Sequence, residues 1–221
     1  MKKDNIFSIM DEYEKYSYPK IQQVEDWYST NSDIRWYANC VSEFEDDNIT
    51  EFYLNDSYSK ETRWDFWNNV VDCFVNNNIK TNLDIGCANN HFSFLCNKKN
   101  IFSVGIDPRE NCVKQSKHIF EKNFGTENYG YVGDIKTFAE FFSSYSSNLF
   151  DCISILNFLH GGEHNPIEIK NLFEVLPKIS KYAIITEPRW DSLGLPKITE
   201  NYSVIDTIEN TVSTHILYKL I

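Results

Sequence analysis

The segment from Thr81 to Ser93 constrains the fold more than any other part of the chain. It reads Thr-Asn-Leu-Asp-Ile-Gly-Cys-Ala-Asn-Asn-His-Phe-Ser, so a short apolar strand runs into a turn of small residues and then into a helix. Gly86 allows the backbone to approach a ligand closely. Ala88 and Asn90 are small or tolerant of positive φ. Because ligands of open α/β sheets bind at the carboxyl ends of strands, the segment predicts a nucleotide-like ligand at this turn.

Two alternatives stay open for the turn. The first is a dinucleotide-binding Rossmann turn, in which three glycines let a pyrophosphate reach the helix N-terminus, but this turn contains only Gly86. Asp84 at the tip of the strand would also repel a pyrophosphate, whereas it suits a ligand that carries positive charge. The second alternative is a glycine turn with an Asp cap, which any α/β protein can contain. Charge therefore favours a cationic nucleotide-like ligand over NAD.

Residues 84–90 resemble the first motif of the class I methyltransferases that use S-adenosylmethionine (SAM). That motif runs acidic, any, Gly, any, Gly, any, Gly, and here Ala88 and Asn90 stand at the second and third glycines. Each departure is mild, because Ala adds one methyl group and Asn enters the left-handed region readily, at a cost of about 1 kcal/mol. The resemblance implies that the cofactor SAM is bound by Asp84, Gly86, Cys87, Ala88 and Asn90.

A second carboxylate ends the next β-rich run, residues 101–107. Asp107 follows Asp84 by about 20 residues, which is the spacing of an acid that accepts hydrogen bonds from ribose hydroxyls. Pro108 is predicted to open a helix over residues 109–124, since proline at a helix start needs no backbone donor. The resemblance implies that Asp107 and Pro108 belong to the cofactor site.

A third carboxylate, Asp134, follows a short strand predicted at residues 129–133. The resemblance implies that Asp134 and Ile135 lie beside the adenine ring, with Asp134 accepting a hydrogen bond from its amino group. An Asp directly after a strand is also a common helix N-cap, and this alternative stays open. Three acidic residues at three consecutive strand ends favour a binding site.

The rest of the chain keeps the alternation of strands and helices. Strands are predicted at 150–156 and 182–187, and a helix at 166–179 has apolar residues at spacings of three and four that face the sheet. Two last strand-like runs, 202–208 and 214–220, are linked too closely for a crossover helix and must pair as a hairpin. The predicted fold is α/β, with a doubly wound seven-stranded, mostly parallel sheet and an antiparallel C-terminal hairpin.

Residues 1–78 differ in character, and we predict that they form a helical N-terminal cap on a SAM-binding core of residues 79–221. Four of the five tryptophans lie in the cap segment, among acidic residues. Helices are predicted around residues 13–27, 34–44 and 61–76. The aromatic side chains either form the core of the cap or belong to a lid over the acceptor pocket, where they would shield a sulfonium and exclude water.

Composition limits the partners. The formal net charge of −11 and the lack of any Lys/Arg cluster longer than a pair argue against nucleic acid. The six cysteines contain no Cys-x-x-Cys pair, so reduced thiols in the cytoplasm are expected. No run approaches the roughly 18 apolar residues of a membrane span, and no export or membrane segment is predicted. We therefore expect a small-molecule acceptor as the partner.

The loop after the fourth strand is predicted to face the transferred methyl group. It lacks the Asn/Asp-Pro-Pro-Tyr/Phe of adenine and cytosine N-methyltransferases and the Pro-Cys of C5-cytosine enzymes. The resemblance places Asn157 beside the cofactor and His160 near the methyl, where a neutral imidazole takes a proton from an acceptor hydroxyl. His164 is the one other histidine expected at this edge. For His160, a polar loop residue or a helix-capping contact is the alternative.

Two further sets of residues belong to the same predicted edge. His160, Glu163 and His164 have the ligand types of a divalent metal site, but no fourth ligand is identifiable, and no metal is predicted. Arg189 follows the fifth strand and has the chemistry to clamp a carboxylate or phosphate of a small acceptor, unless it is a surface arginine. Arg189, Trp190 and His164 are the predicted acceptor-binding residues.

The sequence thus predicts a SAM-dependent methyltransferase that acts on a small, hydroxylated acceptor such as a sugar or metabolite. A methyltransferase of a protein or a tRNA is one alternative, and the charge opposes the tRNA. A methyltransferase-like scaffold without cofactor is another, suggested by Ala88 and Asn90 in place of glycines. Retention of Asp84, Asp107 and Asp134 argues against such decay.

Overall fold

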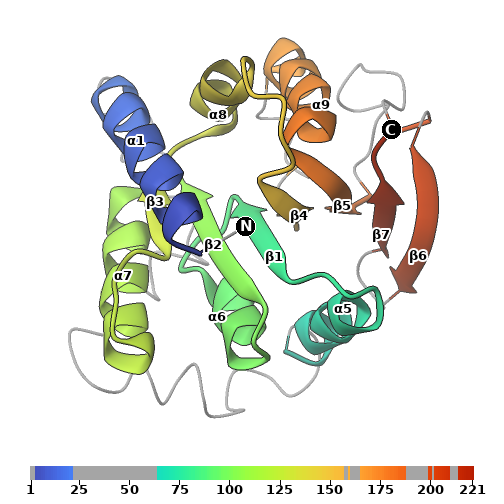
Figure 1. Cartoon of the computed structure of the whole chain (residues 1–221), viewed down its shortest axis with the longest axis horizontal. Coiled ribbons are helices and arrows are strands. Elements are labelled where there is room, and N and C mark those ends of the chain that lie inside the picture. Colours follow the sequence, from blue (N-terminus) through green and yellow to red (C-terminus); the bar gives the residue numbers. More distant parts are fainter. Residues whose placement is uncertain are drawn as a thin grey trace.

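The structure, a computed structural model, describes residues 3–21, 64–156, 159, 165–187, 199–200, 202–209 and 214–221. Their helices and strands follow one another along the chain as shown in Figure 1: α1 (Lys3–Ile21), α5 (Trp64–Asn76), β1 (Thr81–Ile85), α6 (His91–Lys98), β2 (Phe102–Asp107), α7 (Glu110–Phe124), β3 (Gly130–Val132), α8 (Ile135–Phe142), β4 (Phe150–Ile155), α9 (Pro166–Ile179), β5 (Ser180–Thr186), β6 (Ser203–Glu209) and β7 (Thr214–Lys219). No helix in these ranges is long and apolar enough to cross a membrane.

A seven-stranded sheet of order β3-β2-β1-β4-β5-β7-β6 runs through the molecule. The strands from β3 to β5 pair in parallel, whereas β7 pairs antiparallel with both β5 and β6. Figure 1 shows α5, α6 and α7 along one face of the sheet and α8 and α9 along the other. The predicted doubly wound sheet with its antiparallel C-terminal hairpin is therefore confirmed. The strand order reverses between β1 and β4, which is where open α/β sheets bind ligands.

Burial along the strands follows from this layering. All residues of β2, and all but the first of β1, are buried, as expected for parallel strands covered on both faces. The strand β6 at the edge is exposed over most of its length. On one face of the sheet, Trp67, Val71 and Phe74 of α5 pack in the cluster that contains strand residues Ile184 and Leu217. The helix predicted at residues 61–76 is therefore present as α5 and packs on the sheet through this face.

Helix α1 begins ten residues before the predicted start near residue 13, because its apolar stripe begins earlier. Its buried residues lie at helical spacings, Ile6, Met10, Tyr13, Ser17 and Ile21. The first three belong to the same hydrophobic cluster as side chains of β1, β2 and β4, so α1 is part of the main core. The predicted helix at 34–44 lies outside the described residues, as do 22–27, and the boundary at residue 78 stays a prediction.

Helix α1 also protects the open edge of the sheet at β3. The Val132 N–H donates to Glu14 Oε1 at 2.9 Å, and the Ser17 hydroxyl donates to the Val132 carbonyl. These two side chains pair the backbone groups that an edge strand leaves free. Helix α1 thereby fixes the end of β3, two residues before Asp134.

Candidate cofactor site

The turn between β1 and α6 enters the left-handed region at every second residue. The φ angles are 75° at Gly86, 49° at Ala88 and 65° at Asn90. These are the three positions at which the resembled motif has glycine. Ala88 and Asn90 therefore keep the glycine-like path of the turn in spite of their Cβ atoms, at a cost of about 1 kcal/mol or slightly more each.

The side chain of Asn90 holds the turn against the neighbouring elements. Its Nδ2 donates to the Tyr129 carbonyl at 2.7 Å and to Ser116 Oγ at 3.1 Å, and the residue is fully buried. Gly105 in β2 lies under the same turn, where a Cβ would come within 2.6 Å of Cys87 Cβ and would collide with Asn90 Oδ1. Gly105 was not among the predicted site residues, although a glycine inside a strand pattern signals a close backbone approach.

Asp84 is a buried carboxylate near the end of β1. Ser154 lies opposite it in β4 and donates to Asp84 Oδ1 at 2.7 Å. Asn82 Nδ2 donates in turn to Ser154 Oγ at 3.0 Å and to Ser103 Oγ at 2.9 Å, which links the three central strands. Burial, with a smaller contribution from the negative charge of Asp107, raises the pKa of Asp84 to about 7, although the hydrogen bond from Ser154 lowers it. A cation beside Asp84 would favour its ionised form.

Asp107 ends β2 beside the turn, and its carboxylate is almost fully buried. Oδ2 accepts a hydrogen bond from the Ala88 N–H at 2.8 Å, and Oδ1 accepts one from the Arg109 N–H at 3.0 Å. The Arg109 guanidinium completes the pairing, with Nε 2.8 Å from Oδ1 and Nη2 3.0 Å from Oδ2.

Arg109 is the N-cap residue of α7, so the prediction that Pro108 opens this helix is wrong: Pro108 lies before the cap.

Asp134 is the N-cap of α8. Its Oδ1 accepts from the Thr137 N–H at 2.7 Å and from Thr137 Oγ1 at 2.8 Å, and the Asp134 N–H donates to Thr137 Oγ1 at 3.2 Å. Among the described residues, Asp134 Oδ2 has no such partner. The hydroxyl oxygen of Tyr13 in α1 lies 3.1 Å from Thr137 Oγ1. The Tyr13 ring also packs so closely on Gly133 that a Cβ would not fit there. Ile135, also predicted at this site, is the buried first residue of α8.

The residues predicted to act after the fourth and fifth strands lie outside the described part of the chain. These are the predicted base His160, the predicted acceptor residues His164, Arg189 and Trp190, and Asn157 of the predicted cofactor site. Glu163 lies outside it as well. Their roles therefore stay predictions. Within the described ranges, no group of three or more His, Cys, Asp or Glu side chains is arranged to hold a metal ion.

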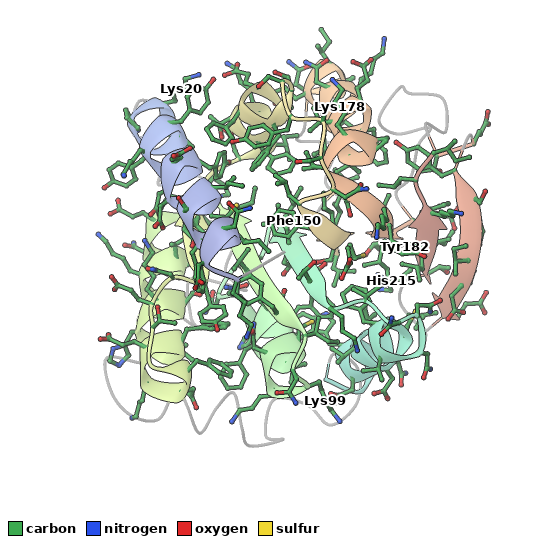
Figure 2. All side chains as sticks on the ribbon, viewed as in Figure 1. Lys20, Lys99, Phe150, Lys178, Tyr182 and His215 are labelled. Carbon is green, nitrogen blue, oxygen red and sulfur yellow. The ribbon has the colours of Figure 1, made fainter. Side chains whose placement is uncertain are left out.

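One expectation about this edge is wrong, because a histidine other than His160 and His164 lies there. His215, labelled in Figure 2, pairs with Thr186 at the carboxyl end of β5, since β7 runs antiparallel and begins at this edge. Its Nδ1 lies 2.7 Å from Thr186 Oγ1, and the residue is fully buried. His215 thus ties β7 to β5. The reversed direction of the last strand was the signal that would have found it.

Comparison with known proteins identifies the fold. No protein-family model and no curated protein matches the sequence. Among solved structures, WbdD, a bifunctional kinase-methyltransferase, is 20% identical over 75% of this chain and 43% of its own, with a TM-score of 0.57. Magnesium protoporphyrin IX methyltransferase (ChlM) from Synechocystis PCC 6803, solved with bound SAM, is 14% identical over 90% of this chain and 94% of its own, with a TM-score of 0.54.

A third structure, the methyltransferase domain of bacterial CtHen1-C, is 14% identical over 70% of this chain and 96% of its own, with a TM-score of 0.53. The chain spans less than half the length of the WbdD structures that it matches. At these identities the likeness concerns the fold. The chain has the class I, Rossmann-like fold of SAM-dependent methyltransferases.

Proposed function

We propose that the protein is a SAM-dependent methyltransferase. The observation that carries the proposal is the turn at residues 86–90, which keeps three left-handed positions and packs on Gly105 beside the buried Asp107. Solved methyltransferases with the same fold, one of them with bound SAM, support the assignment. This geometry also favours an intact site over a scaffold that has lost its cofactor.

The residues of the site fit the chemistry of SAM. Asp84 supplies negative charge for the ammonium and sulfonium groups, and Asp107 supplies acceptors for the ribose hydroxyls. Asp134 Oδ2 and Ile135 suit the amino edge and the face of adenine. When bound, SAM supplies a methyl group that is already activated, so the protein contributes mainly proximity, orientation and exclusion of water. A dinucleotide is disfavoured because Asp84 repels a pyrophosphate.

The acceptor in this proposal is a small hydroxylated molecule. His160 takes the proton from the acceptor hydroxyl, Asn157 lies beside the cofactor, and Arg189, Trp190 and His164 bind the acceptor. The net charge of −11 supports this choice over a tRNA. A cytoplasmic location belongs to the same proposal, and the five described cysteines are buried, which is consistent with reduced thiols.

The test separates the three acceptor classes. The enzyme and labelled SAM are incubated in three parallel reactions, each with one fraction of a cell extract: small molecules, proteins or RNA. The proposal expects S-adenosylhomocysteine (SAH) to form with the small-molecule fraction, and Asp107→Ala to form it more slowly at limiting SAM. Turnover with the protein fraction alone or the RNA fraction alone would show that the acceptor is a protein or an RNA and not a small molecule. Binding of SAM without turnover in any fraction would favour the non-catalytic scaffold.

A further inference from the structure

The carboxylate proposed to bind ribose is already fully paired within the chain. Four donors converge on Asp107: the backbone N–H groups of Ala88 and Arg109, and Nε and Nη2 of the Arg109 guanidinium. The two side chains differ in accessibility, with 26% of Arg109 and 2% of Asp107 exposed. A planar guanidinium that pairs both oxygens of a carboxylate uses the same acceptors that two vicinal ribose hydroxyls require.

We propose that Arg109 is an internal competitor of the cofactor, a latch that the ribose hydroxyls must displace from Asp107. The inference rests on the proposed function, because it assumes a nucleoside cofactor at this site. With the latch closed, the buried Asp107 carboxylate has a partner in the free protein and does not stand as an uncompensated charge. With the latch open, both oxygens are available to the hydroxyls.

The local structure allows the guanidinium to leave while the carboxylate stays in place. Arg109 is the N-cap of α7 and lies outside its first turn, so its side chain can move without unwinding the helix. The two backbone donors, Ala88 N–H and Arg109 N–H, continue to orient the Asp107 carboxylate. Only the charged fork, which is partly exposed, has to be exchanged for hydroxyls.

A closed latch lowers the affinity for every ligand that uses the ribose site. The apparent dissociation constant equals the intrinsic one divided by the fraction of molecules with the latch open. SAM and its product SAH carry the same ribose, so the binding of both is weakened by the same factor. Release of SAH is therefore faster than it would be without Arg109. A latch that is open in about one molecule in ten weakens binding about tenfold, which is about 1.4 kcal/mol.

Arg109→Met removes the latch, and Lys114→Met is the matched control. Lys114 lies on the same helix and pairs with Glu110 at 2.7 Å, and its side chain is 66% exposed. Each variant loses one positive charge, but only Arg109→Met frees Asp107. Calorimetry should show SAM and SAH binding about tenfold tighter to Arg109→Met, with Lys114→Met close to wild type.

A pair of nucleosides tests the ribose hydroxyls directly. Adenosine should gain affinity for Arg109→Met, whereas 2′,3′-dideoxyadenosine, which lacks the competing hydroxyls, should not. Equal or weaker binding of SAM by Arg109→Met, or an equal gain for the dideoxynucleoside, would overturn the latch and leave the proposed function standing. If neither wild type nor variant binds SAM or adenosine, the proposed function itself fails. Should Arg109→Met not fold, Arg109→Lys keeps the charge without the fork and should gain about threefold.

Discussion

Replacing Asp84 by Asn should make the protein more stable while it loses its cofactor. Burial and the charge of Asp107 raise the pKa of Asp84 from its ordinary value of 3.8 to about 7 in the folded protein. Each pKa unit corresponds to about 1.4 kcal/mol, so the ionised side chain destabilises the fold by about 4 kcal/mol at most. Asn cannot ionise, and its Oδ1 can still accept the hydrogen bond from Ser154.

The direction in which stability changes with pH follows from proton binding at Asp84. Between about pH 4 and pH 7 the folded protein holds a proton at Asp84 that the unfolded chain has released, so stability falls as the pH rises through this window. The advantage of Asp84→Asn should be small near pH 4, grow by about 1.4 kcal/mol per pH unit, and level off above pH 7. Urea unfolding of both proteins from pH 5 to pH 8.5 measures the difference.

A second variant checks the cause. Ser154→Ala removes the hydrogen bond that lowers the pKa of Asp84, so its stability should fall over a wider pH range than that of the wild type. Calorimetry on Asp84→Asn should show at least tenfold weaker SAM binding at pH 8, because the negative charge is gone. A stability difference that does not change with pH, or an Asn variant less stable than wild type at pH 8, would refute the reasoning.

Other substitutions test the turn and the predicted base. Gly105→Ala should lower the free energy of unfolding by about 3 kcal/mol in thermal unfolding and remove most of the SAM affinity in calorimetry, since the new methyl collides with the turn. The control Gly125→Ala, at φ 74° in open space, should lower the free energy of unfolding by about 1 kcal/mol and leave SAM binding unchanged. Asn90→Gly restores the glycine of the resembled motif. It should nevertheless lower the unfolding free energy by about 1 kcal/mol, because the loss of two hydrogen bonds, about 2 kcal/mol, outweighs the relief of about 1 kcal/mol of left-handed strain. A stabilised variant would contradict this. His160→Gln should lower turnover by about 10² to 10⁴ at nearly constant SAM affinity, with His164→Gln milder, and full turnover would exclude the base.

The fold was predictable from the sequence because its signals are local. Each buried strand is a short apolar run, and Asp84, Asp107 and Asp134 each fall at or near the end of one. The first ten residues of α1 were not predicted because charged residues such as Asp4 and Asp11 interrupt its apolar stripe there. Ser17, within the predicted helix, is buried because its hydroxyl donates to Val132 of β3, a contact far along the chain that the sequence does not specify.

The candidate site was predictable in part, for the same reason. Strand ends locate Asp84 and Asp107, and the motif locates the turn. The pairing of Arg109 with Asp107 and the contact of Gly105 with Cys87 depend on how two segments meet in space, which spacing alone does not specify. His215 reaches the same edge only because β7 runs antiparallel to β5.

Calorimetric titration with SAM tests the central claim most directly. The wild type should bind SAM and SAH but not NAD or NADP, and Asp107→Ala should bind SAM at least about tenfold more weakly through loss of charge-assisted hydrogen bonds. Asp151→Ala is the control, because Asp151 also accepts two backbone hydrogen bonds, from the N–H groups of Lys80 and Thr81, but at the opposite end of the sheet, and it should leave SAM affinity unchanged. Tighter binding of NAD or NADP than of SAM, or equal affinity of Asp107→Ala and wild type for SAM, would contradict the account.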